Sequence, residues 1–316
     1  MPTQTEAGKA FEYALITTAE NELSAYGNVS TVKDSSFAVA AKCFQLFSAA
    51  EQLKYSKAST AAIKHLLDLE PRLIHPFNAN DDLNLRLAQD VEGGKGDVRD
   101  LLISRTAQDW VIGLSAKNNH KAVKHSRLSN TIDFGKEWLG LQCSYEYFAT
   151  INPIFSELRT LKTEGALWRS LPSKHQRFYM PVLEAFLKEL IELDQQHPGS
   201  VPAALLTYLI GNMDFYKVIK RKGFTEIFGF DLRGTLNKAA GANKPVMKVS
   251  RLKLPTRIID LSFKKNSTDT LFLTCDEGWQ ISFRIHNASS RVEPSLKFDI
   301  NLIGQPQSLY AHHVQW

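Results

Sequence analysis

Two strand-like segments between residues 97 and 118 predict that this chain forms a sheet with helices around it. The stretch "GDVRDLLIS" contains a short apolar run after a glycine cluster, and "WVIGLSAK" follows it beyond a polar turn. Short apolar runs bounded by glycine and polar residues are typical of neighbouring strands in a hairpin or meander. We therefore expect an α/β fold that contains this pair of strands.

Helical patterns lie on both sides of the strand pair. Apolar residues recur at helical spacing over residues 7–27 and over 36–69, where a division near residues 56–59 and a stop at Pro71 predict two helices. Residues 120–170 become helical again, and amphipathic helices are predicted over 177–199 and 201–223.

From about residue 225 the pattern becomes strand-like. The predicted strand segments are 246–254, 257–265, 270–288 with a turn at "DEG", and 295–304. A chain of 316 residues exceeds the usual size of one domain, so we expect a helix-rich core at residues 1–225 and a β-rich region at 226–316.

Composition excludes several classes of protein. The three cysteines lie far apart without ligand spacing, which argues against both a disulfide framework and a zinc site. The start "MPTQTEAGKA" lacks the features of a secretory leader, and no apolar run is long enough to cross a bilayer. We expect a cytoplasmic protein with no membrane partner. The net charge of +5 fits many enzymes as well as proteins that bind phosphates.

The strand pair brings acids and an amine toward one end of a sheet. Alternation places Ser115 and Lys117 on the same face of their strand, while Asp97 and Asp100 lie at the start of the neighbouring strand. Carboxylates that hold a divalent cation, together with an ammonium group, suit phosphodiester hydrolysis. The spacing is equally compatible with surface residues beside a turn and a solvated lysine at a strand end.

A cationic stretch without acids, "NNHKAVKHSRLS", follows Lys117. If it is helical, Lys121, Lys124 and His125 share one side and Arg127 lies on the flank. Such a run attracts a nucleic-acid backbone, whereas a solvated helix face would usually include Glu or Asp. Charge patterning favours contact with phosphates, and a solvated face remains the alternative.

Three segments resemble a known group of enzymes. "GDVRDLLI" followed by "VIGLSAK" resembles the PD-(D/E)XK nuclease pattern, and "GKAFEYAL" resembles the early helix of that superfamily, which carries a Glu, here Glu12. "GLSAKNNHKAVKHSRLS" and "FRIHNASSRVEPSLKFDI" are similar to HaeIII-like type II restriction endonucleases. The resemblance implies a mixed-sheet PD-(D/E)XK core at 1–225 with the catalytic hairpin at 95–118, and a DNA-recognition role for 226–316.

The resemblance also implies an activity. It implies Mg²⁺-dependent cleavage of double-stranded DNA at a short palindrome, GGCC, leaving a 5′-phosphate and a 3′-hydroxyl. A palindromic site favours a homodimer, because the two-fold axes then match. A cognate DNA methyltransferase would act on the same site without forming a stable complex with the enzyme.

By position, the resemblance assigns roles in the active site. Asp97 or Asp100 would be the metal-binding catalytic acid, Lys117 the catalytic lysine, and Glu12 a carboxylate of the metal site. The sequence departs from the pattern at Ser115, where the superfamily has Asp or Glu. The second carboxylate must then come from the other Asp, from Glu12 or from Glu92, with Ser115 taking the remaining place in the catalytic set.

DNA contacts are expected in two segments. Those after the catalytic lysine are Asn118, Asn119, His120, Lys121, Lys124, His125 and Arg127. His120 has a general-base role as an alternative to phosphate contact. Arg284, Asn287 and Arg291 have donors that suit base edges in the major groove, although Arg284 could instead pair with Glu277 or Asp276.

Two other functions compete with restriction. One is a sequence-nonspecific DNA repair nuclease with the same core. The other is a DNA-binding protein without catalysis, in which Ser115 marks a decayed site.

Overall fold

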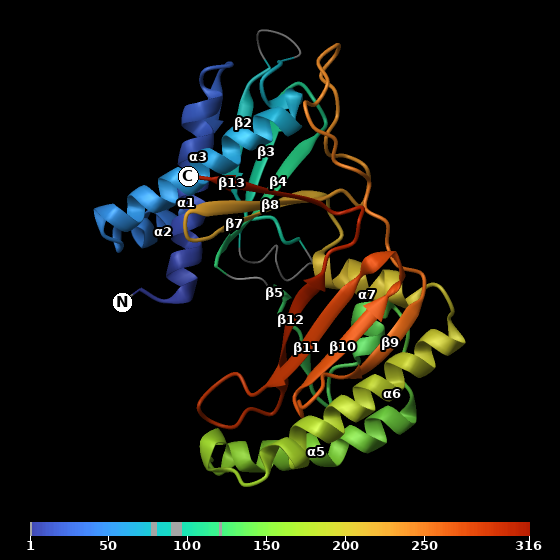
Figure 1. Ribbon diagram of the computed structural model, residues 1–316. Helices are drawn as coiled ribbons and strands as arrows, with labels where there is room; N and C mark the ends of the chain where they lie inside the picture. Colours follow the sequence, from blue (N-terminus) through green and yellow to red (C-terminus); the bar gives the residue numbers. More distant parts are fainter. Residues whose placement is uncertain (1, 77–80, 90–96, 120–121) are drawn as a thin grey trace. The chain divides into compact units, whose positions relative to one another are not determined.

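The computed structural model describes residues 2–76, 81–89, 97–119 and 122–316, and the chain divides into two compact units (Figure 1). The first unit comprises Met1–Lys121, Asn212–Leu252 and Ser308–Trp316. The second unit comprises Ala122–Gly211 and Lys253–Gln307. Each unit therefore contains segments that are far apart in the sequence.

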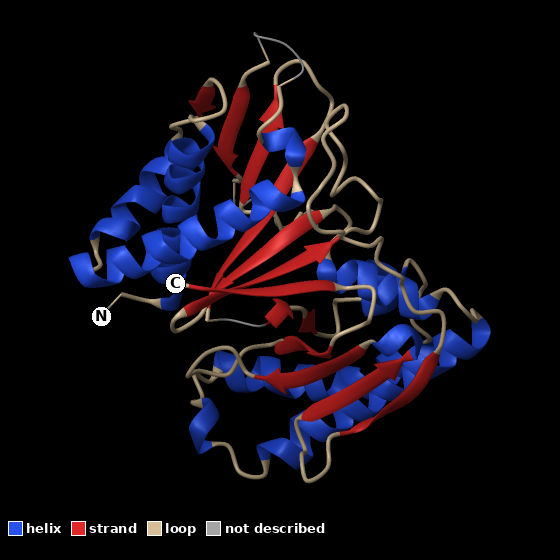
Figure 2. Cartoon of the chain, turned by 45° about the horizontal axis from the view of Figure 1, so that its top comes forward, coloured by secondary structure: helices blue, strands red, loops and turns tan. Residues whose placement is uncertain are grey.

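A mixed sheet forms the centre of the first unit. Within the described residues it has seven strands in the order β1-β2-β3-β4-β7-β8-β13. Strands are drawn in red and helices in blue in Figure 2. The strands are β1 (Val29–Thr31), β2 (Leu83–Leu87), β3 (Leu101–Arg105), β4 (Val111–Asn118), β7 (Phe215–Lys220), β8 (Phe224–Phe230) and β13 (Tyr310–Gln315). The pairs β1–β2 and β4–β7 are parallel, and the other neighbours are antiparallel.

Among the described residues, the α-helices of the first unit are α1 (Gln4–Leu23), α2 (Ser35–Gln45) and α3 (Ala49–Leu69). The side chain of Thr3 caps α1 in a capping box with Glu6, which satisfies free amides of the first turn. Buried apolar side chains of α1 and α3 join those of β3, β4 and β7 in one core. This packing fixes α1 beside the end of β4.

The predicted division near residues 56–59 is wrong, because the break lies at residues 46–48. The hydroxyl of Ser48 accepts a hydrogen bond from the Glu51 amide and starts α3 there. Ser59 is buried inside α3. The expected stop is confirmed: α3 ends at Leu69, and Pro71 begins a short 3₁₀ turn, Pro71–Leu73.

The second unit contains an antiparallel sheet with helices. In the described residues its order is β5-β12-β11-β10-β9, with β6 also paired to β12. The strands are β5 (Ala122–Lys124), β6 (Arg127–Leu128), β9 (Ile258–Phe263), β10 (Thr270–Cys275), β11 (Gln280–His286) and β12 (Leu296–Gly304). The helices are α5 (Tyr145–Thr163), α6 (Met180–Gln196) and α7 (Val201–Ile210), and α5 and α6 run side by side (Figure 1).

Aromatic side chains dominate the core of the second unit. The ring of Phe186 on α6 lies within 6 Å of the rings of Phe134, Trp138, Phe283 and Phe298. These contacts join α6 to both β11 and β12, and they bury large apolar surfaces that stabilise the unit. The predicted helix over 177–199 and the predicted turn at "DEG" are confirmed.

Three local predictions are wrong. Residues 122–128 form β5 and β6 instead of a helix, because their backbone pairs with β12. Residues 215–220 form the buried strand β7, which lies between β4 and β8. Residues 246–254 form no strand in the described structure, since their amides bond to scattered acceptors such as the Asn237 side chain and the Asp231 carbonyl.

The division into units also differs from the linear boundary at residue 225. The strand β8 runs across that boundary and pairs with β7 of the first unit, and β13 adds to the same sheet. The mixed α/β fold class that we expected is confirmed. In the part of the chain that the structure describes, no helix has the length and apolarity needed to cross a membrane.

Candidate active site

Asp100 and Lys117 meet at one end of the mixed sheet. Asp100 lies directly before β3, and its amide donates to the Leu114 carbonyl on β4 at 2.7 Å. Its Oδ2 accepts hydrogen bonds from the Ala116 amide at 2.7 Å, from Lys117 Nζ at 3.1 Å and from Ser115 Oγ at 3.2 Å. The hairpin therefore holds the carboxylate against the last residues of β4, as the sequence predicts.

Glu12 on α1 extends this cluster. Its side chain is nearly buried and forms an ion pair with Lys9 at 3.1 Å. Burial, followed by the negative charge of Asp100, raises the pKa of Glu12 to about 7, while Lys9 and Lys117 oppose the shift. The early helix thus places a second carboxyl group close enough to Asp100 for the two to interact.

Asp97 has different partners. Its carboxylate accepts hydrogen bonds from Arg99 Nε at 2.8 Å and from Arg99 Nη2 at 2.6 Å. Burial raises the pKa of Asp97, but the hydrogen bonds from Arg99 outweigh it and the pKa lies below its usual value. The Arg99 side chain in turn covers Gly113, where a Cβ would lie only 2.0 Å from Arg99 Cδ. Asp97 and Arg99 therefore form a pair that packs on β4.

Lys217 belongs to the same region, and sequence reasoning missed it. The parallel register of β4 and β7 pairs Ser115 with Lys217, so the two side chains share a face of the sheet. The side chain is buried, and this burial, with the charges of Lys117 and Arg221, lowers the pKa of Lys217 to about 7. Asp100 and Glu226 oppose the shift. The aromatic and β-branched residues of "FYKVIK" were the available strand signal, but the helical spacing of the lysines obscured it.

The acids of this cluster fit a hard divalent cation. Across the described residues, no group of three or more His, Cys, Asp or Glu side chains could hold a metal ion by itself. Asp100 and Glu12 nevertheless offer carboxylate oxygens, which are the ligands such cations prefer. Burial and then the charge of Asp100 raise the pKa of Glu12, and a bound cation would offset the repulsion between the two carboxylates. With water as the remaining ligand, this donor set suits Mg²⁺.

The residues after Lys117 have partners within the protein. The Asn118 amide donates to the Tyr55 hydroxyl at 3.3 Å, and Asn119 has a left-handed backbone with its carbonyl bonded to Arg221. His120 and Lys121 lie outside the described residues, as does Glu92.

The other cations of this stretch lie in the second unit. Lys124 Nζ lies 3.5 Å from the centre of the Tyr208 ring and donates to the Tyr208 carbonyl. His125 Nδ1 lies 2.9 Å from an Asp299 carboxylate oxygen, while burial lowers the pKa of His125, and Arg127 forms an ion pair with Glu293 at 2.7 Å. These three side chains contact neighbouring residues of the fold, so a phosphate would compete with those contacts.

The residues predicted to read bases differ in their exposure and in their contacts within the protein. Arg284 is exposed and lies 3.8 Å from Asp269, not beside Glu277 or Asp276. The side-chain Nδ2 of Asn287 donates to the carbonyls of Ser289 and Arg291, and its Oδ1 accepts from the Glu293 backbone amide. The Asn287 side chain therefore stabilises its own loop. Arg291 is exposed.

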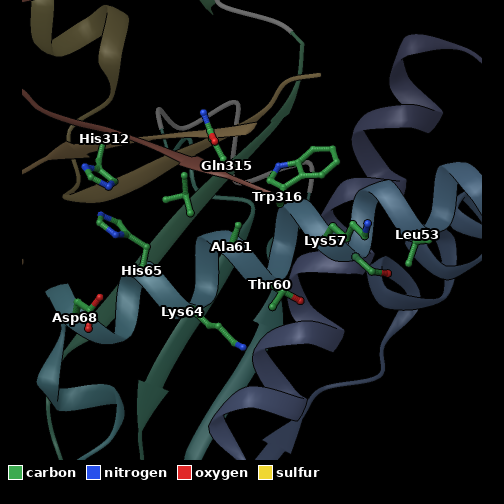
Figure 3. A pocket seen from close by; sticks show the side chains of 12 residues that line it. Leu53, Lys57, Thr60, Ala61, Lys64, His65, Asp68, His312, Gln315 and Trp316 are labelled. Atoms are coloured by element: carbon green, nitrogen blue, oxygen red, sulfur yellow. The ribbon is translucent and has the colours of Figure 1, made fainter. Parts of the chain in front are cut away.

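Two hollows are lined by residues other than those of the acid cluster. One, of about 690 Å³, lies between α3 and β13, where the His65 ring stacks on His312 (Figure 3). None of the predicted site residues lines it. The other, of about 540 Å³, belongs to the second unit and is lined by Arg127, Lys162 and Arg291 together with Glu293.

The mixed sheet with its helices, and the carboxylate and lysine at its strand ends, form the arrangement that is expected of a nuclease with a PD-(D/E)XK core. Comparison with known proteins then gives the family. The model of the HaeIII restriction endonuclease family matches residues 8–306, and the chain belongs to this family. It is 43% identical over 311 residues to the type II restriction enzyme HaeIII of Haemophilus aegyptius, covering 98% of this chain and 97% of the relative. A search of solved structures found no match.

Proposed function

We propose that this protein is a type II restriction endonuclease that hydrolyses both strands of DNA at the palindrome GGCC. The observation that carries this proposal is the family match along nearly the whole chain, which includes the Asp100–Lys117 cluster. The expected DNA site comes from the likeness to HaeIII-like enzymes. A restriction enzyme meets its DNA in the cytoplasm, which is where we expect this protein to act.

Asp100 and Glu12 are the residues proposed to hold Mg²⁺. When bound, the cation supplies a Lewis acid that lowers the pKa of a water molecule and offsets charge on the phosphate. Asp100 is already oriented for this role, because the Ala116 amide and the Ser115 hydroxyl both donate to its Oδ2. Ser115 thus supports the acid and does not replace a carboxylate.

Lys117 is proposed as the catalytic cation. About a third of its side chain is exposed, and its Nζ lies 3.1 Å from Asp100. An ammonium group at this position can bind the phosphate oxygen and stabilise negative charge that develops during hydrolysis. The pair with Asp100 orients Lys117 before DNA binds.

The second unit is proposed to contribute DNA contacts. The hollow lined by Arg127, Lys162 and Arg291 offers guanidinium and ammonium groups to phosphates or to guanine edges. The exposed Arg284 is a further candidate. A palindromic site also leads us to propose a homodimer, with a cognate methyltransferase that protects the same sequence.

Digestion of a mapped plasmid tests the proposal. With Mg²⁺ we expect discrete fragments that match the GGCC positions, and EDTA in excess over Mg²⁺ should abolish them. Plasmid methylated beforehand at these sites is the matched control, and it should stay intact. A smear of fragments would instead indicate a nonspecific nuclease, and binding without cleavage in Mg²⁺ or Mn²⁺ would indicate a protein without catalysis.

A further inference from the structure

We propose that Lys217 is a positioning residue of the cleavage reaction, which acts by directing the Lys117 ammonium toward Asp100 and the scissile phosphate. This inference rests on the proposed function. The strand that carries Lys217, β7, is not part of the hairpin that supplies Asp100, Ser115 and Lys117. A second strand would therefore take part in forming the active site.

The first step of the argument is the register of the sheet. Lys217 is the direct partner of Ser115, and Ile219 is the partner of Lys117. Neighbouring strands lie about 4.8 Å apart, and partners in a parallel pair point to the same face. The small Ser115 side chain leaves space beside the strand for the long Lys217 side chain. The lysine thus lies next to the residue that stands in place of a carboxylate.

The second step concerns the free energy that is needed to bury the Lys217 ammonium group. Only 7% of Lys217 is exposed, and burial of an ammonium group is unfavourable unless other charges compensate it. The charges that act on it are mixed, because Asp100 and Glu226 favour the ammonium whereas Lys117 and Arg221 oppose it. A methionine of similar length would fill the same volume without this cost. Buried ionisable groups with shifted pKa values are concentrated at functional sites.

The third step is the effect on Lys117. When Lys217 carries its proton, repulsion between the two ammonium groups on one face favours the position of Lys117 near the Asp100 carboxylate, where its Nζ lies 3.1 Å from Oδ2.

The same strand offers a matched control. Lys220 is 6% exposed, and the β4–β7 register pairs it with Asn118. It lies over the Tyr55 ring, 4.9 Å from the ring centre, on the helix-covered face of the sheet. Loss of Lys220 removes a buried lysine from β7 without removing a charge next to Ser115.

The test is single-turnover cleavage of a duplex with one GGCC site in Mg²⁺, with duplex affinity measured separately in Ca²⁺. Lys217→Met should lower the cleavage rate by about 100-fold or more. Its duplex affinity and melting temperature should stay close to those of the wild type. Lys217→Arg, which keeps the charge, should recover at least about tenfold over the Met variant, while Lys220→Met should cleave within about threefold of the wild type.

The proposal is overturned if Lys217→Met cleaves within about threefold of the wild type, or if both Met variants lose activity in parallel with their melting temperatures. Should Lys217→Met fail to fold, Lys217→Gln is judged by the same criteria. Wild-type protein that cuts no DNA would overturn the proposed function itself. The activity of the wild type therefore distinguishes the two failures.

Discussion

Asp97 and Asp100 lie three residues apart in the sequence, but their carboxylates have different partners. Asp97 binds its neighbour Arg99, and this pair packs over Gly113. Asp100 accepts hydrogen bonds from three successive residues of β4. The sequence leaves the choice between the two acids open, and the geometry favours Asp100 as the catalytic one.

Substitution of each acid by its amide tests this assignment. Asp100→Asn should lower the rate of DNA cleavage by about 100-fold or more, because it removes the charge that faces Lys117. Asp97→Asn should keep most of the cleavage rate and lower the free energy of unfolding by about 1 kcal/mol, through loss of the pair with Arg99. Cleavage assays and urea unfolding of both variants provide the measurement. The opposite ranking of the two cleavage rates would contradict the assignment.

At the scale of elements, α3 and β13 are joined by an unusual contact between histidines. The His65 ring stacks on His312 at 4.3 Å, and its Nε2 lies 2.7 Å from the Tyr310 hydroxyl. Burial, followed by the charge of His312, lowers the pKa of His65 to about 4, and Asp68 opposes the shift. The contact therefore requires a neutral His65.

This contact predicts sensitivity to acid. The unfolded chain binds a proton at His65 near its ordinary pKa of 6.5, whereas the folded protein does so only near 4. Stability from this residue is therefore present above pH 6.5 and is lost as the pH falls toward 4. Between pH 7 and pH 5, the free energy of unfolding should fall by about 1 to 2 kcal/mol more in the wild type than in His65→Gln. Equal losses in urea titrations of the two proteins would refute this account.

Local patterns predicted those elements whose partners are close in the sequence. Apolar spacing and one polar turn were enough to predict the helix α1 and the β3–β4 hairpin. The prediction of this hairpin also placed Asp100, Ser115 and Lys117 in the candidate site. The strands β5 and β7 were predicted as helices, because their partners β12 and β4 lie far away in the chain. Lys217 was missed for this reason, since only the parallel register places it beside Ser115.

At the scale of the whole molecule, neither unit is a continuous segment of the chain. The first unit carries the acids and lysines of the proposed active site, and the second carries the exposed arginines proposed to contact DNA. The cationic stretch after Lys117 leads directly from one unit into the other along the sequence. A linear division into a catalytic part and a recognition part could not describe this arrangement.

The central claim is that the Asp100–Lys117 cluster performs site-specific cleavage, and Lys117→Ala tests it most directly. A duplex with one GGCC site is incubated with Mg²⁺ and with either protein, and binding is measured in Ca²⁺. The wild type should cut both strands, leaving 5′-phosphate and 3′-hydroxyl ends, and should spare a duplex with one altered base pair. Lys117→Ala should bind the duplex comparably and cleave it about 1,000-fold more slowly or not at all. Cleavage by Lys117→Ala at the wild-type rate would contradict the account.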